Sequence, residues 1–145
     1  MGEAFSANYQ VTIGADFSVK FLETSSISAK LQIWDLSGQP RFDKVRKHFY
    51  TKLDGVIFVF DISRSESLEN FPNWINEASS HNPDPVPLIV FGNKIDLKNE
   101  ETPTFPTKLT YDWSGEKEAE VIMTSAKTGE NVSQAFDRLF ETIFS

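Results

Sequence analysis

Residues 88–97 read LIVFGNKIDL, which is four apolar residues, a glycine and a polar turn. An unbroken apolar run of this length is typical of a strand that is covered on both faces. Residues 55–61 repeat the pattern, and residues 121–123 form a shorter version. Helical patterns separate the runs, so we predict an α/β fold with a mostly parallel sheet. Ligands of such sheets bind beyond the carboxyl ends of the strands.

The segments around these strands predict one hairpin and several helices. Residues 16–23 and 30–35 alternate in polarity across a short polar turn, which predicts an antiparallel hairpin. Residues 68–78 and 132–143 have one apolar helical face each. A further helix is predicted near residues 107–114. Ser63 and Glu66 could form a capping box before the first of these helices, and Pro72 interrupts the helical pattern.

Composition excludes several classes of protein. The net charge of −7 leaves no basic footprint for nucleic acid. No apolar run approaches the roughly 18 residues that a membrane helix needs. The chain has no cysteine, which excludes disulfides, thiolate metal ligands and a prenyl anchor. With no signal peptide at its start, the 145-residue chain is expected to be one cytoplasmic domain without a lipid anchor.

The turn Asn93-Lys94-Ile95-Asp96 has the chemistry to recognise a guanine base. Guanine presents two N–H donors on one edge, at N1 and at the 2-amino group, and one carboxylate can accept both. Adenine offers no such pair, and a wrong base would leave the carboxylate unpaired in a dry site. Asp96 is therefore a candidate guanine-reading residue. The alternative is a polar loop that only connects a strand to a helix.

A second polar block, WDLSGQ at residues 34–39, follows another predicted strand. Asp35 can hold Mg²⁺, directly or through water, because a hard cation prefers oxygen ligands. Gly38 offers a backbone N–H that no side chain screens, which suits a phosphate oxygen. Gln39 could orient a water molecule. The alternative is a turn that an aspartate caps, and the block alone does not decide between them.

A third block, TSAKTG at residues 124–129, could bring the backbone N–H of Ala126 to the guanine O6, or could be an ordinary turn. The three blocks in this order resemble a small GTPase of the Ras superfamily, most similar to the Rab branch. The resemblance runs from about residue 5 to the end of the chain. The segments that carry it are YQVTIGADF (9–17), LQIWDLSGQPRF (31–42), GNKIDL (92–97) and TSAKTGENV (124–132).

The resemblance implies a three-layer P-loop NTPase-like fold that binds GTP or GDP with Mg²⁺. Thr12 would ligate Mg²⁺ and touch the γ-phosphate, and Asp35 would hold the ion through water. Gly38 would bond the γ-phosphate, and Gln39 would position the attacking water. The pocket for guanine would be formed by Asn93, Lys94, Asp96, Ser125, Ala126 and Lys127.

The resemblance also implies protein partners. Phe17, Trp34 and Phe49 match the aromatic trio that Rab-like proteins present to effectors and regulators, with Phe49 in place of the usual tyrosine. From burial preferences alone, Phe17 and Trp34 would be placed in a core or a half-buried sheet. Ser37 and Pro40 also depart from the family's usual residues, and neither change removes a known functional side chain.

One part of the family's pattern is missing from residues 1–145. The family needs G-x-x-x-x-G-K-S/T, whose backbone N–H groups and lysine surround the phosphates. No two glycines of this chain lie five apart and none precedes a lysine; they are residues 2, 14, 38, 55, 92, 115 and 129. We therefore expect an N-terminally incomplete domain without the first strand and first helix, the strand belonging between residues 30–35 and 55–61.

This absence leaves the enzymatic activity of the chain open. One hypothesis is a GTPase whose N-terminal segment is missing from the sequence, with the complete unit hydrolysing GTP as a switch. The other is a P-loop-less pseudo-GTPase that acts as a protein-interaction module, and a fragment without function is a third. Each lost hydrogen bond to a charged group costs about 1.5–3 kcal/mol, so we expect impaired nucleotide binding by this chain alone.

Overall fold

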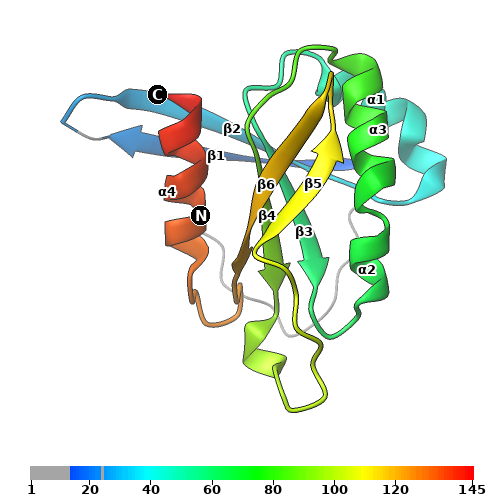
Figure 1. Ribbon diagram of the computed structural model, residues 1–145. Helices are drawn as coiled ribbons and strands as arrows, with labels where there is room; N and C mark the ends of the chain where they lie inside the picture. Colours follow the sequence, from blue (N-terminus) through cyan, green and yellow to red (C-terminus); the bar gives the residue numbers. More distant parts are fainter. Residues whose placement is uncertain (1–13, 24) are drawn as a thin grey trace. The chain divides into compact units, whose positions relative to one another are not determined.

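The computed structural model describes residues 14–23 and 25–145 (Figure 1). The chain divides into two compact units, Met1–Thr51 and Lys52–Ser145, and each is described by itself. The larger unit holds a four-stranded sheet, and the smaller unit holds a two-stranded one. No helix of the described residues is long and apolar enough to cross a membrane.

The four-stranded sheet has the order β3-β4-β6-β5. Its parallel part consists of β3 (Val56–Asp61), β4 (Leu88–Asn93) and β6 (Glu116–Met123). The last strand, β5 (Lys108–Asp112), runs antiparallel to β6. The predicted α/β class with a mostly parallel sheet is therefore confirmed, and β6 extends well ahead of the three residues that the sequence predicted.

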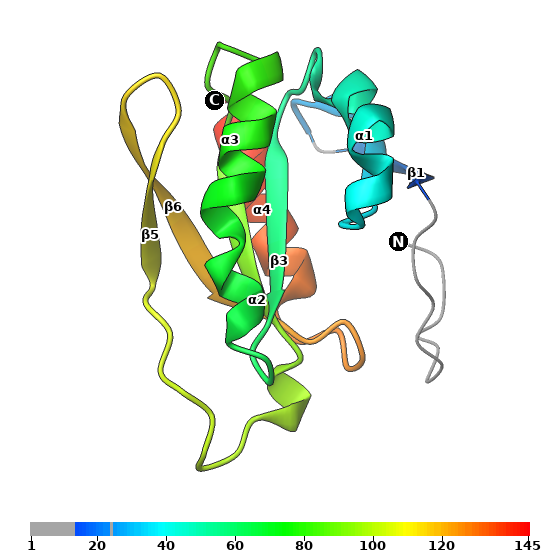
Figure 2. The same cartoon turned by 90° about the vertical axis from the view of Figure 1, so that its right-hand side faces the viewer.

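Helices cover both faces of this sheet (Figure 2). On one face lies α3 (Phe71–His81), and the ring centroids of its Phe71 and of Phe58 of β3 are 5.0 Å apart. On the other face lies α4 (Val132–Ile143), and the ring centroids of its Phe136 and of Phe91 of β4 are 5.5 Å apart. Together these make the three layers that the sequence predicted. The remaining elements of this unit are the short α2 (Glu66–Glu69) and the 3₁₀ turn η2 (Ile95–Leu97).

The break predicted at Pro72 is confirmed. The helical segment over residues 68–78 is divided between α2 and α3, and Pro72 occupies the first turn of α3, where a missing N–H is tolerated. The predicted capping box is wrong. Ser65 precedes α2 and makes no side-chain cap, whereas the Ser63 hydroxyl donates to Asp61 Oδ1 at 2.6 Å.

The predicted helix near residues 107–114 is also wrong, since this segment forms β5. Leu109 and Tyr111 are half-buried while their neighbours are exposed, a period of two that suits a strand. A tight turn follows, in which Ser114 and Gly115 have φ of 54° and 114°. The Trp113 indole is 1% exposed and donates to Asn82 O at 2.8 Å. A contact this distant in sequence is invisible to local periodicity.

The core of the larger unit centres on β4, whose first five residues are all buried. This confirms a strand covered on both faces. The same prediction for residues 55–61 is wrong in part, because Val59 of β3 is 54% exposed. Since β3 ends the row of four strands, it has a hydrogen-bonded neighbour on one side only among the described residues. Phe58 and Phe60 of the same strand are 7% and 2% exposed, so the exposure lies on one face of β3.

The smaller unit contains the predicted hairpin, formed by β1 (Ala15–Glu23) and β2 (Ser28–Leu36) in antiparallel register. The short turn η1 (Pro40–Phe42) and a helix that the sequence did not predict, α1 (Asp43–Tyr50), follow it. In the described residues β2 and β3 belong to separate sheets. This division is consistent with a fold whose first strand is missing between them.

Candidate functional site

The carboxyl ends of β3, β4 and β6 meet at one edge of the sheet, as expected for parallel strands. Asp61 and Asn93 are register partners and form the last pair of β3 and β4. Gly92 lets the strand pass close to its neighbours there, because a Cβ on it would lie 2.5 Å from Met123 Sδ. The loops after β4 and β6 start from this tightly packed edge.

Asn93 ties the two loops together. Its Oδ1 accepts the backbone N–H of Ala126 at 2.9 Å and the Thr124 hydroxyl at 3.3 Å. The Ala126 N–H that the sequence assigned to guanine O6 is therefore already bonded within the protein. A base oxygen would have to share this donor with Asn93.

Asp96 is held by the loop that follows β6. The Ser125 hydroxyl donates to Asp96 Oδ1 at 2.7 Å and accepts the N–H of Thr128 at 3.1 Å. Ser125 is 0% exposed, whereas Asp96 is exposed. A buried hydroxyl thus fixes the direction of a carboxylate whose other oxygen has no protein partner among the described residues. This oxygen is available to a ligand.

Lys94 pairs with the carboxylate at the end of the neighbouring strand β3, and its side chain stays partly exposed. It has a left-handed backbone, with φ of 74°, and its Nζ lies 2.7 Å from Asp61 Oδ2. The other carboxylate oxygen of Asp61 accepts both the N–H and the hydroxyl of Ser63. Burial opposes ionisation of Asp61, but the bonds from Lys94 and Ser63 outweigh it and lower the pKa of that carboxyl.

The structure therefore brings together five of the six residues predicted for the guanine pocket. Hydrogen bonds join Asn93 to Ala126 and Ser125 to Asp96, and Lys94 lies in the loop of Asn93 and Asp96 with its amine paired to Asp61. The sixth, Lys127, follows Ala126 in the same loop and is exposed. This arrangement presents the fixed carboxylate of Asp96 to a ligand, with Lys94 nearby in the same loop, at the carboxyl edge of the parallel sheet.

The residues predicted for the phosphate and metal side lie in the smaller unit. Asp35 is the next-to-last residue of β2 and the register partner of Asp16 of β1, and both side chains are exposed. Carboxylate oxygens at adjacent positions suit a hard cation such as Mg²⁺. Within residues 14–23 and 25–145 no group of three or more potential metal ligands is found. Thr12, the other predicted Mg²⁺ ligand, lies outside the described residues.

Gly38 and Gln39 lie in a loop that a buried arginine organises. Arg46 of α1 is 6% exposed, and its Nη1 donates to the carbonyl oxygens of Ser37 and Gln39, both at 2.8 Å. The Ser37 N–H in turn donates to Gly14 O at 2.8 Å. Gly38 is exposed and Gln39 half-buried. The sequence motifs did not indicate Arg46, and an arginine on a short helix carries no local signal of burial.

The three aromatic residues predicted as a partner surface lie in contact. The centroid of the Trp34 ring lies 4.6 Å from that of Phe17 across the hairpin and 4.6 Å from that of Phe49 of α1. Phe17 and Trp34 are 44% and 43% exposed, so the cluster is open to solvent. The three contiguous rings support the predicted partner surface, because contiguous exposed apolar groups mark interaction sites.

Comparison with known families decides the relationship. The model of the Ras family matches residues 1–145. The chain belongs to the Ras family. Among its Ras-family relatives, "Ras-related protein RABG3b" of Arabidopsis thaliana is 38% identical over 137 residues, or 91% of this chain. "Ras-related protein Rab7" of Drosophila melanogaster is 36% identical over 141 residues, or 94% of this chain.

A human relative, "Ras-related protein Rab-8B", is 33% identical over 145 residues, or 99% of this chain. The matched segments cover 68%, 67% and 68% of RABG3b, Rab7 and Rab-8B respectively, so this Ras-family chain spans about two thirds of their length. These names support a Ras-superfamily small GTPase near the Rab branch. They also support the small-GTPase fold predicted from the sequence.

Proposed function

We propose that this Ras-family chain carries the guanine-binding half of a GTP-binding site. The observation that carries the proposal is the Asp96 carboxylate, fixed by the buried Ser125 hydroxyl and open on its other oxygen. A preorganised acceptor of this kind can take both N–H donors of a guanine edge without losing freedom on binding. Lys94 and Lys127 would flank the nucleotide, and Asn93 would hold the two loops in register.

The complete fold, with a phosphate-binding loop, would hydrolyse GTP and act as a GTP/GDP switch. In it, Thr12 and Asp35 would hold Mg²⁺, which would neutralise charge on the phosphates. Gly38 would donate to the γ-phosphate. Gln39, whose carbonyl Arg46 fixes at 2.8 Å, would orient the attacking water.

Residues 1–145 contain no G-x-x-x-x-G-K-S/T, so this chain alone is proposed to bind nucleotide weakly. Several backbone hydrogen bonds to phosphate would be absent, each worth about 1.5–3 kcal/mol. If guanine contacts supply most of the remaining affinity, the phosphates should add little. GTP and guanosine should then bind to the 145-residue chain with similar strength.

An NMR titration tests both halves of this proposal. Guanosine and Mg²⁺–GTP should shift the amide resonances of residues 93–97 and 124–128 to similar extents, and ATP should not. GTP binding that is micromolar or tighter and Mg²⁺-dependent would disprove the proposed impairment. If no guanine compound shifts these amides, the guanine site of this chain is disproved.

A substitution sharpens the test of base recognition. Asp96→Asn replaces one acceptor by an amide donor, which suits the 2-oxo group of xanthine rather than the 2-amino group of guanine. The variant should prefer xanthosine to guanosine in the same titration. Asp84→Asn, at an exposed aspartate outside the two loops, is the control and should leave the preference unchanged.

A second candidate function is a protein-interaction module that needs no nucleotide. The exposed cluster of Phe17, Trp34 and Phe49 favours it, because contiguous aromatic side chains at a surface mark protein contacts. Effectors or regulators would be the partners. Trp34→Ala should abolish capture of a partner by the chain, with or without GTP. A partner that still binds to this variant, or that requires GTP, would disprove this alternative.

A further inference from the structure

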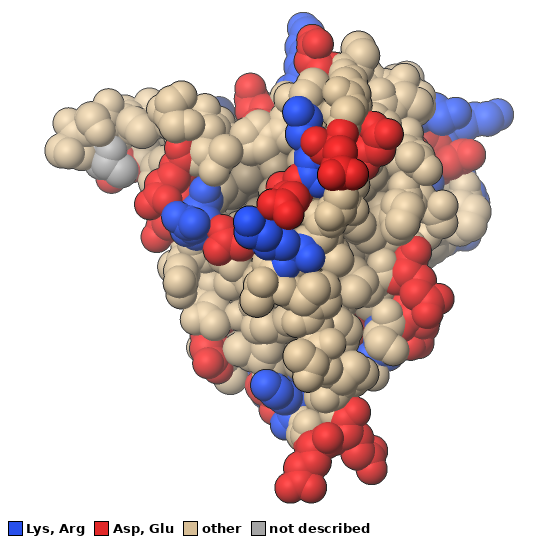
Figure 3. All heavy atoms as spheres, viewed as in Figure 1, with Lys and Arg blue, Asp and Glu red and all other residues tan. Residues whose placement is uncertain are grey.

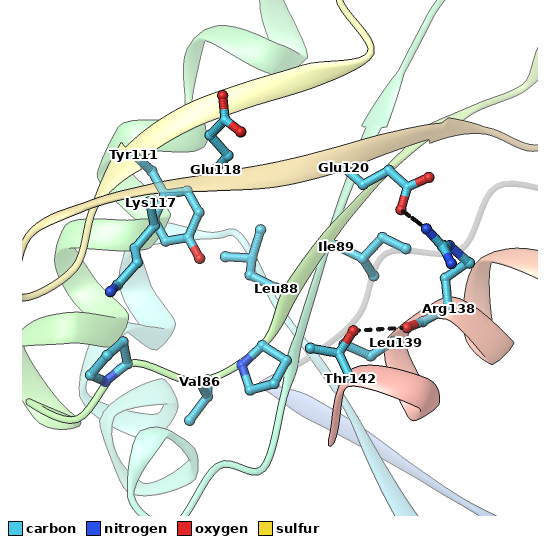
Figure 4. Close-up of a pocket in the computed structure, with 12 residues that line it drawn as sticks. Val86, Leu88, Ile89, Tyr111, Lys117, Glu118, Glu120, Arg138, Leu139 and Thr142 are labelled. Carbon is cyan, nitrogen blue, oxygen red and sulfur yellow. Dashed lines mark hydrogen bonds and ion pairs between the residues drawn. The ribbon is translucent and has the colours of Figure 1, made fainter. Parts of the chain in front are cut away.

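The larger unit contains a second candidate site, a cavity of about 400 Å³. It lies where β4 begins at Leu88, at the edge of the sheet remote from Asn93 (Figure 4). Its walls come from the loop before β4, from β5 and β6, and from α4. The volume falls within the range of about 300–1,000 Å³ that small-molecule sites occupy.

The strand register shows where the sheet opens. The first register pair of β4 with β6 is Ile89 with Glu120, although β6 begins already at Glu116. The loop before β4 bonds toward the other neighbour instead, because Pro87 O accepts the Val56 N–H of β3 at 2.9 Å. The first half of β6 therefore has no register partner in β4.

Hydrogen bonds tie together two of the segments that contribute walls to the cavity. Trp113 Nε1 donates to Asn82 O at 2.8 Å, and the Ser114 hydroxyl donates to Pro83 O at 2.6 Å. Both bonds join the tip of the β5–β6 hairpin to the start of the loop before β4. The cavity is thus preformed, which lowers the entropic cost of filling it.

Two polar side chains without protein partners meet at one end of the cavity. Tyr111 and Lys117 are register partners on β5 and β6, so they share a face, and Figure 4 shows their polar tips at the same end of the cavity. In the part of the chain that the structure describes, no carboxylate pairs with the Lys117 amine and no group bonds the Tyr111 hydroxyl. The Tyr111 hydroxyl is a donor at neutral pH, and burial raises its pKa further above the ordinary value of 10.

The other charges of the lining are already neutralised. Glu118 pairs with Lys108 at 3.1 Å, and Glu120 pairs with Arg138 at 3.3 Å. Figure 3 shows acidic and basic side chains interspersed over this part of the surface. Both glutamates also alternate to the face of β6 away from Lys117. Lys117 is therefore the unneutralised cation of the lining.

Most of the remaining lining is apolar, with Thr142 as the polar exception. Leu88 alternates to the same face of the sheet as Lys117 and is 9% exposed, whereas Ile89 pairs with Glu120 and faces the other way. The other apolar members of the lining are Pro85, Val86, Pro87 and Leu139. An apolar wall with a few convergent polar groups at one end is the usual pattern of a small-molecule site. The two donors at that end match the two oxygens of a carboxylate.

We propose that this cavity binds a small organic carboxylate with an apolar body. The Lys117 amine and the Tyr111 hydroxyl receive the carboxylate, and the body lies over Leu88 and the adjacent prolines. The site does not depend on nucleotide binding, because none of its residues belongs to the Asp96 loops.

Three probes on the 145-residue chain test this proposal by NMR. Octanoate has both the charge and the apolar body, 1-octanol has only the body, and acetate has only the charge. Octanoate should shift the amides of residues 86–89 and 117–120 saturably, and the other two probes should bind at least about tenfold more weakly. Equal binding of 1-octanol, or no saturable shift with octanoate, would overturn the proposal.

Two substitutions at exposed or half-exposed positions check the assigned donors. Lys117→Gln should weaken octanoate binding by about tenfold or more, and Tyr111→Phe, which keeps the ring beside Phe71, by about threefold to tenfold. Lys98→Gln, at an exposed lysine after η2, is the matched control and should change nothing. If Lys98→Gln weakens binding as much as Lys117→Gln, the effect is one of net charge and the proposed site is wrong.

Discussion

The two halves of the predicted nucleotide site are each organised by one buried polar side chain, but these residues sit in different surroundings. Ser125 is 0% exposed and follows β6, which pairs with the fully packed β4. Arg46 is 6% exposed on an eight-residue helix in a unit whose sheet has two strands. Ser125 adds hydrogen bonds to a loop that the sheet already anchors, whereas Arg46 bonds two carbonyl groups of a loop that follows a two-stranded sheet.

The comparison shows which interactions keep a functional loop in one conformation. Two-stranded sheets are marginally stable alone, and Phe17, Val19, Phe21 and Trp34 of the hairpin are each more than two fifths exposed. The loop of Gly38 and Gln39 therefore relies on charge-assisted bonds from Arg46. The guanine-side loops rely first on the sheet and only then on side-chain hydrogen bonds.

The largest effect is therefore expected at Arg46. Arg46→Met keeps an unbranched apolar stem but removes the guanidinium, and with it both bonds to the Ser37 and Gln39 carbonyls. At about 1.5–3 kcal/mol for each charged hydrogen bond, the loss of both should cost about 3–6 kcal/mol of local stability. The Ser37 amide should therefore exchange with solvent roughly 150-fold faster or more.

A neighbour on the same helix provides the control. Lys47 is exposed, so Lys47→Met should change this exchange by less than about twofold, a change of under about 0.5 kcal/mol. If Arg46→Met behaves like Lys47→Met, the loop is ordered by something other than the arginine. The contrast drawn between the two half-sites would then be wrong.

Sequence patterns predicted the parts of the molecule that local chemistry determines. The buried run of β4, the alternation of the hairpin and the apolar face of α4 each show one period over a continuous segment. Asn93 and Asp96 were placed correctly at the carboxyl edge of the sheet because a polar turn directly follows a buried strand. In each case the deciding information lies within about ten residues.

The failures depend on contacts that a repeating polarity pattern does not record. The segment of β5 became a strand because it pairs with β6 and because Trp113 bonds a carbonyl 31 positions away. Val59 is exposed while Phe58 and Phe60 of the same strand are buried, so one face of β3 is less covered than the other. Arg46 is buried against carbonyl groups only seven and nine positions before it, which no periodic pattern marks.

The second expected effect lies at Ser125. Ser125→Ala removes a buried hydroxyl that bonds Asp96 Oδ1 and the Thr128 N–H, which should cost about 1–3 kcal/mol of the free energy of unfolding. Urea titration measures this cost. Guanosine binding should weaken as well, because the carboxylate loses its fixed direction. The β4 amides should nevertheless keep their protection from exchange, since the sheet anchors the loops.

Thr128→Ala is the matched control for this experiment. It shortens an exposed side chain in the same loop and removes one bond, from the Glu130 N–H at 3.3 Å. Its cost should stay below about 1 kcal/mol. If Ser125→Ala opens β4 to exchange, then the hydrogen bonds of Ser125 stabilise the sheet edge. The guanine-side loops would then depend on their buried side chain as the loop of Gln39 depends on Arg46.

The smallest effect is expected for the ion pair of Lys94 with Asp61, which is partly exposed. Lys94→Met should cost about 0.5–1 kcal/mol near neutral pH. The folded-state pKa of Asp61 lies below its ordinary value of 3.8, so the stabilisation is present above that value and is lost as pH falls through the folded pKa. Urea titrations at about pH 6 and about pH 3 should therefore show the difference between wild type and variant shrinking on acidification.

Lys127→Met separates this pair from a general effect of charge. Lys127 is exposed in the loop of Ala126, and the structure gives it no carboxylate partner among the described residues, so its substitution should be nearly neutral at both pH values. A cost for Lys94→Met that stays constant with pH would mean that the lysine stabilises through its packed carbon chain and not through Asp61. In that case the left-handed backbone at residue 94 would have to be held by the sheet edge alone.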